Sequence, residues 1–336
     1  MSRSTRPSLF IPGRRSAVVA AAAFCAAPAW SQGRASPAPW PSRALRILVG
    51  FPGGSSPDLL ARALAEPLSR RLGQPVIVEN RPGASGNLAA GLVAHATDGH
   101  TIGVMINGNL TIARLLNPKL SFDPARDFAP LSLIATAPLV LVAAADASGA
   151  SPKAFLETAR QAGSRWNYGS PGVGTIAHIG MELIKARTGI AAVHVPYPGN
   201  PQVIGALLGG QIQLALLPPG LAMAQVKAGK LRAIAVTGAG RSTLAPEVPS
   251  LAEAGVPGVL LDIWNAAAAP VSMPAVHAQL LAEHITSIAR TPEMRATLFQ
   301  QGWQVVATAP EGLAQRMKTD TAELGRIIAS KSIRVE

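Results

Sequence analysis

The amino-acid sequence predicts an α/β fold in two lobes, each a sheet flanked by helices. Short apolar runs alternate along most of the chain with helical patterns of about 10–15 residues, which is typical of parallel sheets built from β-α-β units. Two glycine-rich openings, at 53–56 and 169–174, each precede a predicted helix. The chain has 336 residues, enough for two cores, and we assign one opening to each lobe.

The predicted elements follow from these runs and from the residues that begin and end helices. The expected strands are 46–51, 76–79, 101–106, 131–136, 139–144, 166–169, 192–195, 212–217 and 232–237. The expected helices between them are 57–72, 87–96, 152–161, 175–188, 201–208 and 221–228. Ser151-Pro152 is a typical helix start, and Gly73, Gly163 and Gly189 are typical helix ends. The C-terminal part is mostly helical, over 272–290, 291–301 and 310–330, with one short strand at 303–306.

The N-terminus predicts an export signal over residues 1–31. Arg14-Arg15 precede an apolar run at 17–29, and small residues then surround a cleavage point near Ser31. The run is too short to span a membrane as a stable helix, and both the general and the twin-arginine export routes stay open. Cys25 is lost with the signal, so the mature chain has no cysteine for a disulfide, a nucleophile or a metal site. Residues 32–42 predict a flexible leader, and the mature protein is expected to be soluble and extracytoplasmic.

The composition favours a folded protein that does not bind nucleic acid. Apolar residues make up 48% of the chain and charged residues 14%, which disfavours disorder. The net charge is +12, but four of the arginines lie in the first 31 residues and the other basic residues are scattered. Aromatic residues are only 4%, too few for base-stacking platforms.

Phosphate and nucleotide sites are disfavoured by spacing. Neither glycine-rich opening carries the lysine that a P-loop needs. Residues 172–177 match G-x-G-x-x-A, but no acid follows about 20 residues later. We therefore expect neither nucleotide nor any other cofactor.

Catalytic and metal motifs are also missing from the sequence. It contains no G-x-S-x-G elbow around Ser55, Ser56 or Ser85, no H-E-x-x-H and no carboxylate pair suited to acid–base work. His178 and His194 flank the second opening, where a structural role and contact with a ligand both stay open. Two loops suited to an anion, without catalytic residues, favour binding over catalysis.

Several long motifs resemble the Bug family, the extracytoplasmic solute receptors of tripartite tricarboxylate transporters. They include FPGGSSPD at 51–58, LGQPVIVENRPGASGN at 72–87, DGHT at 98–101 and DPARDF at 123–128. NYGS at 167–170, GTIAH at 174–178, HVPY at 194–197, AGKLRA at 228–233 and PSLAEAG at 249–255 continue the resemblance to the end of the chain.

The resemblance implies a two-lobed periplasmic binding protein of type II-like architecture, with crossing strands between the lobes and a cleft for a small carboxylate. The ligand-binding residues that it implies are Phe51, Pro52, Gly53, Gly54, Ser55, Ser56, Asn107, Ser170, Gly172, Thr175, His178 and Tyr197. It also implies a membrane permease as partner, with a sensor protein as the alternative, and a monomer in the periplasm. We place lobe 1 at 43–142 plus 263–336 and lobe 2 at 143–262.

Departures from the family pattern narrow the class of ligand that we expect. Pro57 stands where the family commonly has threonine, Pro198 replaces a lysine, and Leu217 lies where many members carry an aspartate. Loss of that acid favours a carboxylate without an amino group: a di- or tricarboxylate or an aromatic acid.

A secreted α/β enzyme acting on a carboxylated substrate is the rival prediction. The segment 80–87 is either a rigid turn or a ligand contact, and Trp264 either packs at the return between lobes or lies in the cleft.

Overall fold

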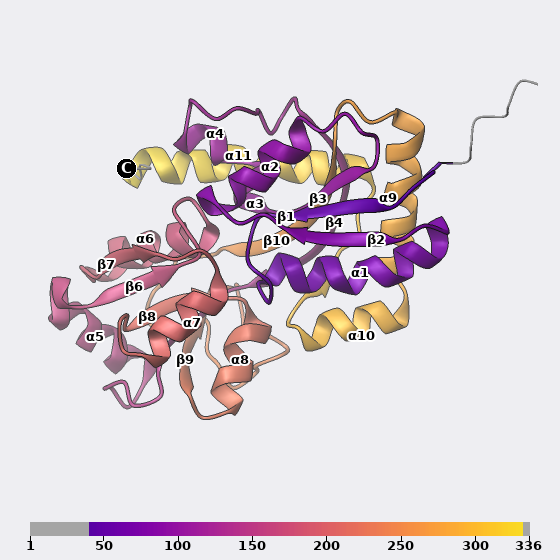
Figure 1. Cartoon of the computed structure of the whole chain (residues 1–336). Helices are drawn as coiled ribbons and strands as arrows, with labels where there is room; N and C mark the ends of the chain where they lie inside the picture. The colour runs from indigo at the N-terminus through magenta and orange to yellow at the C-terminus, as the bar shows by residue number, and fades with distance from the viewer. Residues whose placement is uncertain (1–39, 332–336) are drawn as a thin grey trace, which may run out of the picture. The chain divides into compact units, whose positions relative to one another are not determined.

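The protein folds around two separate β-sheets, each covered by helices on both faces (Figure 1). The structure is a computed structural model that describes residues 40–331. The predicted two-lobed α/β class is confirmed. The predicted signal segment lies outside the described residues, and none of the described helices is long and apolar enough to cross a membrane.

The first sheet has six strands. In spatial order they are β11 (Gln304–Val305), β4 (Phe128–Pro138), β10 (Asp262–Pro270), β3 (Thr101–Ile106), β1 (Leu45–Val49) and β2 (Val76–Asn80). Strand β1 pairs in parallel with β2 and β3, whereas β10 is antiparallel to both of its neighbours. The expected parallel pairing is therefore found for β1, β2 and β3, whereas β10 and β11 run opposite to the other four strands.

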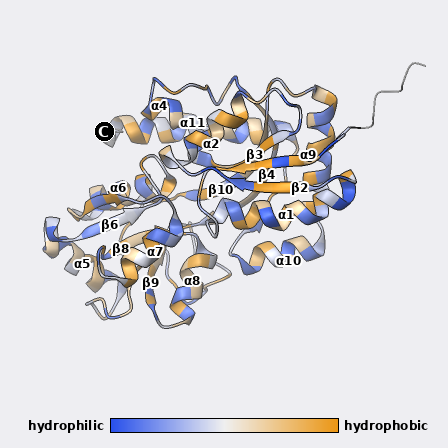
Figure 2. Cartoon of the chain, in the orientation of Figure 1, coloured by the Kyte–Doolittle hydropathy of each residue, from blue (hydrophilic) through white to orange (hydrophobic). Residues whose placement is uncertain are grey.

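Helices bury both faces of the first sheet. One face packs against α1 (Ser56–Leu72), α9 (Ala275–Ala289) and α10 (Pro292–Gln300), and the other packs against α2 (Asn87–Ala94), α3 (Asn107–Leu110), α4 (Ala113–Leu116) and α11 (Pro310–Lys331). Alternation in β1 matches this arrangement, because Ile47 and Val49 face α1 while Leu48 faces α2. Along α1, hydrophobic and hydrophilic residues alternate as expected of a helix with one buried side (Figure 2).

The second sheet has five strands and the same mixed construction. Its order is β7 (Val193–Pro196), β6 (Asn167–Ser170), β8 (Leu214–Leu217), β5 (Val140–Ala144) and β9 (Leu231–Val236). Strand β6 is parallel to β7 and β8, and β5 is antiparallel to β8 and β9. Helices α5 (Pro152–Ala162) and α6 (Ile176–Thr188) cover one face, and α7 (Asn200–Leu208) and α8 (Pro219–Lys227) cover the other.

Three segments join the sheets. The chain leaves the first sheet after Pro138 and returns to it at Asp262. These crossings lie near the expected lobe boundaries at 142/143 and 262/263, and the boundaries themselves stay a prediction. The buried Thr237 ties the two crossings together, since its hydroxyl accepts from Leu139 N at 2.8 Å and donates to Leu261 O at 2.5 Å. Helix α11 also packs on both sides: Leu313 and Met317 belong to a first-sheet core, whereas Leu324 and Ile328 belong to a second-sheet core.

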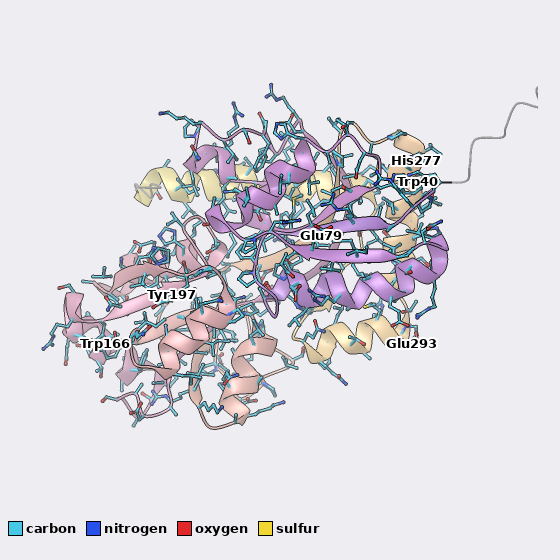
Figure 3. All side chains as sticks on the ribbon, viewed as in Figure 1. Trp40, Glu79, Trp166, Tyr197, His277 and Glu293 are labelled. Atoms are coloured by element: carbon cyan, nitrogen blue, oxygen red, sulfur yellow. The ribbon has the colours of Figure 1, made fainter. Side chains whose placement is uncertain are left out.

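The first described residues pack on the first sheet's helices. The ring of Trp40, at the end of the predicted leader, stacks on His277 of α9 with centroids 4.3 Å apart (Figure 3). Its indole N–H donates to Gly99 O at 3.0 Å.

The largest miss of the sequence prediction is β10. Its stretch Asn265–Ala266–Ala267–Ala268–Ala269 has low β-propensity, so the sequence pattern gave no strand there. In the structure these alanines lie in the middle of the first sheet with helices on both faces, where small side chains and burial outweigh the intrinsic preference of alanine for helices.

The short helices α3 and α4 were also missed, because one helical turn leaves no periodic pattern.

Candidate functional site

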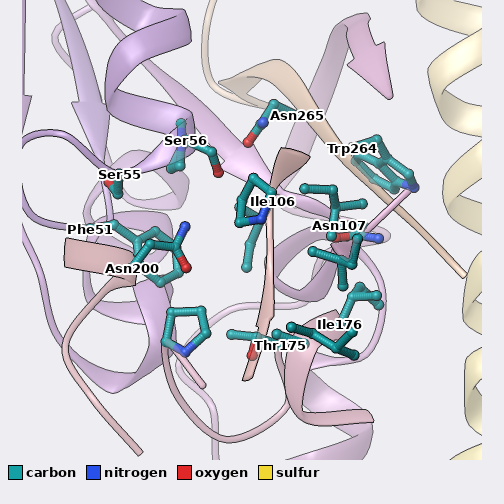
Figure 4. Close-up of a pocket in the computed structure, with 17 residues that line it drawn as sticks. Phe51, Ser55, Ser56, Ile106, Asn107, Thr175, Ile176, Asn200, Trp264 and Asn265 are labelled. Carbon is teal, nitrogen blue, oxygen red and sulfur yellow. The ribbon is translucent and has the colours of Figure 1, made fainter. Parts of the chain in front are cut away.

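A cavity of about 40 Å³ lies between the two sheets, where loops follow the carboxyl ends of strands (Figure 4). From the first sheet's side it is lined by Phe51, Ser55, Ser56, Pro57, Ile106, Asn107, Ile263, Trp264 and Asn265. From the second sheet's side it is lined by Leu139, Pro171, Thr175, Ile176, Ala177, Asn200, Leu216 and Pro218. None of these seventeen described residues is charged, so a charged ligand here would meet only neutral groups.

The first glycine-rich loop is held from behind by a buried carboxylate. Asp58 is 1% exposed, and its Oδ2 accepts from Gly54 N at 2.9 Å. Its Oδ1 accepts from Asn80 Nδ2 at 2.8 Å and from Arg62 Nε at 3.0 Å. Burial, the largest influence, raises the pKa of Asp58, but these hydrogen bonds together hold the pKa below its ordinary value. Asp58 is therefore ionised at neutral pH and fixes the loop against the start of α1.

The cavity side of the same loop carries Ser55 and Ser56. Ser55 Oγ donates to Pro52 O at 2.6 Å, which fixes the turn. Ser56 Oγ makes no hydrogen bond to the rest of residues 40–331. The Ser56 N–H lies in the first turn of α1 and has no intrahelical acceptor, and Pro57 contributes no N–H at all. Replacement of the family's threonine by Pro57 thus leaves an apolar ring at this side of the cavity.

The second glycine-rich loop is braced in a similar way. Thr175 is the N-cap of α6: its Oγ1 accepts from His178 N at 3.5 Å and donates to Gly172 O at 2.8 Å. Ser170 is fully buried, and its Oγ lies 2.7 Å from His194 Nε2 and 3.1 Å from Gly172 O. Thr175 therefore lines the cavity, whereas the hydroxyl of Ser170 faces a polar cluster beneath the loop.

This polar cluster contains both histidines that the sequence singled out. The rings of His178 and His194 stack with centroids 4.2 Å apart, and His194 also stacks on Tyr168 at 4.8 Å. His178 Nδ1 accepts from Gly174 N at 3.2 Å. The Tyr168 hydroxyl donates to Glu182 Oε1 at 2.6 Å, and Lys185 Nζ donates to the same oxygen at 2.7 Å.

The cluster should make the stability of the fold depend on pH. Burial lowers the pKa of His178; burial and then the charge on His178 lower the pKa of His194 to about 3. As pH falls below the ordinary histidine value of 6.5, the unfolded chain takes up protons that the folded chain does not. The free energy of unfolding should therefore fall with pH, by at most about 1.4 kcal/mol per pH unit for each histidine.

We expect this loss in urea titrations between pH 7 and pH 5.5, where the ordinary carboxylates stay ionised. The variant His194→Gln, which keeps a polar group near Ser170, should show a shallower pH dependence. His95→Gln, which changes a histidine outside the cluster, is the matched control for the loss of one imidazole side chain. A slope that His194→Gln does not change would assign the effect to other groups.

The predicted ligand residues fall into three places. Phe51, Ser55, Ser56, Asn107 and Thr175 line the inner cavity. Gly172 and Tyr197 line a wider outer hollow of about 630 Å³, which shares Ile106 and Pro171 with the inner cavity. The remaining five line neither space: Pro52, Gly53, Gly54, Ser170 and His178. The part of all twelve residues in binding stays a prediction.

The outer hollow brings the segment 80–87 against the opposite loop. A Cβ atom on Gly172 would lie 2.3 Å from Ser85 Oγ, so the two loops touch and only glycine fits there. Ala84 and Ser85 have φ values of 47° and 56°, a conformation that non-glycine residues rarely adopt. The segment is therefore a turn with two non-glycine residues in a rarely adopted conformation, and it also forms part of the contact between the lobes. Both sequence alternatives, a rigid turn and a ligand contact, stay predictions.

Two asparagines of the cavity were not predicted from the sequence: Asn200 and Asn265. Asn200 is the first residue of α7 and is 5% exposed, and its Oδ1 has no hydrogen-bond partner in the described chain. Asn265 lies in the missed strand β10. An isolated polar residue ahead of four alanines was the available signal. The described residues contain no group of three His, Cys, Asp or Glu side chains placed to hold a metal ion.

Comparisons with known proteins agree on one family. A family model described as "Tripartite tricarboxylate transporter family receptor" matches residues 60–333. A protein from the tcbD-tcbE intergenic region of Pseudomonas sp. (strain P51) is 33% identical over 86% of this chain and 86% of its own length. The periplasmic binding protein BugD is 26% identical, with a TM-score of 0.84 over 88% of this chain and all of its own.

Two similar solved structures contain ligands. Rpa4515 of R. palustris with adipate is 29% identical, with a TM-score of 0.85, and the match covers 88% of this chain and 99% of the other. MatC (Rpa3494) of Rhodopseudomonas palustris with bound malate is 28% identical, with a TM-score of 0.81 over 86% and 99% of the two chains. The chain therefore belongs to the tripartite tricarboxylate transporter family of receptors, the group that its resemblance to the Bug proteins predicted.

Proposed function

We propose that this protein captures a small carboxylate in the inner cavity between its two sheets and delivers it to a membrane permease. One observation carries the proposal: the N-terminal turns of α1 and α6 line the same uncharged cavity from opposite sheets. The first residue of α7 and the N-cap of α8 line it as well. Helix N-termini present free N–H groups and the positive end of the helix dipole, which favours an anion.

The ligands of the two similar structures support this chemistry. Adipate and malate are small dicarboxylates, and the proteins that bind them share the fold over nearly their whole length. Neutral donors are available here: the Ser56 hydroxyl and the side-chain amides of three asparagines, whereas the hydroxyl protons of Ser55 and Thr175 already go to Pro52 O and Gly172 O. Hydrogen bonds from such groups to an ionised carboxylate are each worth about 1.5–3 kcal/mol, so no arginine is needed.

Binding without turnover fits the residues better than catalysis does. The fold and the family are those of solute-binding receptors. Ser170 and His194 are close enough for a nucleophile–base pair, but Ser170 is fully buried and lines neither space. A histidine whose pKa is about 3 is also a poor general base at neutral pH. We propose a non-enzymatic monomer, acting in the periplasm after removal of the predicted signal.

A ligand screen on the purified mature chain tests the proposal. Thermal shift and calorimetry should show saturable binding of a di- or tricarboxylate or an aromatic acid, and none of the corresponding neutral amides or esters. Ligand at about 100 times its Kd should add about 2.7 kcal/mol to the free energy of unfolding. Mass spectrometry should recover the acid unchanged; a converted product would support the rival enzyme. If sugars or nucleotides stabilise the fold and no acid does, the proposal is wrong.

A pair of serine variants sharpens the screen. Ser56→Ala should weaken binding about threefold to tenfold while leaving the unliganded stability unchanged, because its hydroxyl has no partner in the described chain. Ser55→Ala is the contrasting control, since it removes the bond to Pro52 O and should lower the unliganded stability too. Equal effects on stability would assign Ser56 to the helix start rather than to the ligand.

A further inference from the structure

Asn265 is a buried amide whose two polar atoms both lack a partner. It is 1% exposed, lines the inner cavity, and neither Nδ2 nor Oδ1 has a hydrogen-bond partner within the described residues. Native proteins rarely leave such groups unpaired, since burial without a partner is costly. The side chain is therefore placed for a partner that enters the cavity.

The strand geometry shows that this placement is built into the fold. The register of β10 against β4 shifts between Asn265 and Ala266, which is the position of a β-bulge. Bulges re-aim side chains and are frequent beside functional sites. Figure 4 shows the Asn265 amide on the same side of the cavity as Ser56, at the start of α1.

A second asparagine, Asn107, shows that the partner must supply a hydrogen-bond donor. Asn107 Nδ2 donates to Asp262 O at 3.1 Å, so the orientation of this amide is set by a carbonyl that only accepts. Its Oδ1 is left without a partner in the described chain, and the residue is 1% exposed. The cavity thus holds at least one fixed acceptor. A carboxylate, which only accepts, cannot satisfy it.

The donor that enters must be uncharged. No acidic side chain lines the cavity, so an ammonium group would be buried without a counter-charge. A hydroxyl or a carboxamide donates without charge, and a carboxamide also matches both atoms of Asn265. Resting on the proposed function, we infer that the ligand is a carboxylate that also bears an uncharged hydrogen-bond donor, a hydroxyl or a carboxamide, recognised by Asn265 and Asn107.

Matched acids test this inference by calorimetry on the mature chain. Succinate, malate and succinamate share one four-carbon skeleton. Succinate has no added donor, malate adds a hydroxyl, and succinamate carries a carboxamide. Adipate and adipamate extend the comparison to six carbons. We expect a donor-bearing acid to bind about tenfold or more tightly than its donor-free match. Preference for malate or for the amides would identify which donor is used. Equal or tighter binding of succinate and adipate would overturn the inference while leaving the proposed function intact; no binding of any carboxylate would overturn both.

The variant Asn265→Leu separates recognition from structure. It removes both polar atoms at similar size, so the unliganded protein should keep or gain stability, while the preference for donor-bearing acids falls to about twofold or less. Ser132→Ala is the matched control, because Ser132 Oγ is also buried and unpaired but lies outside the cavity. It should leave the preference unchanged. Loss of unliganded stability in Asn265→Leu with the preference retained would contradict a role in recognition.

Discussion

Replacing Asp58 by alanine is expected to lower the free energy of unfolding by about 2–4 kcal/mol and to weaken ligand binding by more than tenfold. The Asp58 carboxylate is the common acceptor for Gly54 N, Asn80 Nδ2 and Arg62 Nε. Its removal leaves Gly54 N without an acceptor and takes one of the two acceptors from Asn80 Nδ2, which keeps its bond to Phe51 O, at about 1–3 kcal/mol for each N–H group that stays buried and unpaired. The loop at 53–56 then loses the bond that holds it against α1, so its free N–H groups no longer point reliably at a ligand.

Arg62→Ala is the matched control for Asp58→Ala. The Arg62 side chain is 53% exposed, so its ion pair with Asp58 should contribute no more than about 1 kcal/mol. The bonds from Gly54 and Asn80 remain, and binding should be close to that of the wild type. Chemical denaturation gives both stabilities, and calorimetry with the tightest acid of the screen gives both affinities. Asp58→Ala with wild-type affinity would show that the loop keeps its conformation without the carboxylate.

The acid side of the stability profile should reflect the same residue. The pKa of Asp58 is depressed in the fold, so its stabilisation is present above the pKa of the unfolded chain and is lost as pH falls through the lower folded value. The difference between wild type and Asp58→Ala should therefore shrink at strongly acidic pH.

Both glycine-rich loops were found from sequence because their signals are local. Glycines ahead of a helix start, with Pro57 in the first turn or Thr175 at the N-cap, mark a strand-to-helix turn wherever they occur. The structure places both turns at one cavity. The local pattern could not predict the direction of each side chain: the Ser170 hydroxyl lies against His194, and His178 in α6 stacks on the same ring beneath the loop.

Asn265 and the strand that carries it depended on long-range structure. A run of four alanines favours a helix by propensity, and only pairing with β3 and β4 in the middle of the first sheet makes it a strand. Periodicity therefore could not predict the cavity residues at the crossing between the sheets. The residues that the family resemblance implied include Asn107, outside the glycine-rich loops, but not Asn265. Trp264, by contrast, was recognised as a residue of the return between lobes, with packing and the cleft as alternatives. It does both: the side chain is fully buried in a first-sheet core and also lines the cavity.

Trp264 also makes a buried hydrogen bond to helix α11. Its indole N–H donates to Asp320 Oδ2 at 2.6 Å, and the other oxygen of Asp320 accepts from Arg316 Nε at 2.7 Å. Asp320 is 8% exposed and lies on α11, the helix that packs on both sheets. Trp264→Ala should therefore cost about 3–5 kcal/mol, because it leaves a large cavity and deprives a buried carboxylate of a donor.

Trp264→Phe keeps most of the apolar volume and removes the N–H, so it should cost about 2 kcal/mol. If that cost comes from the carboxylate of Asp320, it should largely disappear in an Asp320→Leu background, where no carboxylate remains to lose its donor. Denaturation followed by far-UV circular dichroism gives the four stabilities of this cycle without relying on tryptophan fluorescence. A cost of Trp264→Phe that is the same in both backgrounds would assign it to packing alone. A coupled cost instead means that the wall of the inner cavity and the helix that packs on both sheets are joined through one buried hydrogen bond, so that any movement of α11 relative to β10 must strain or break it.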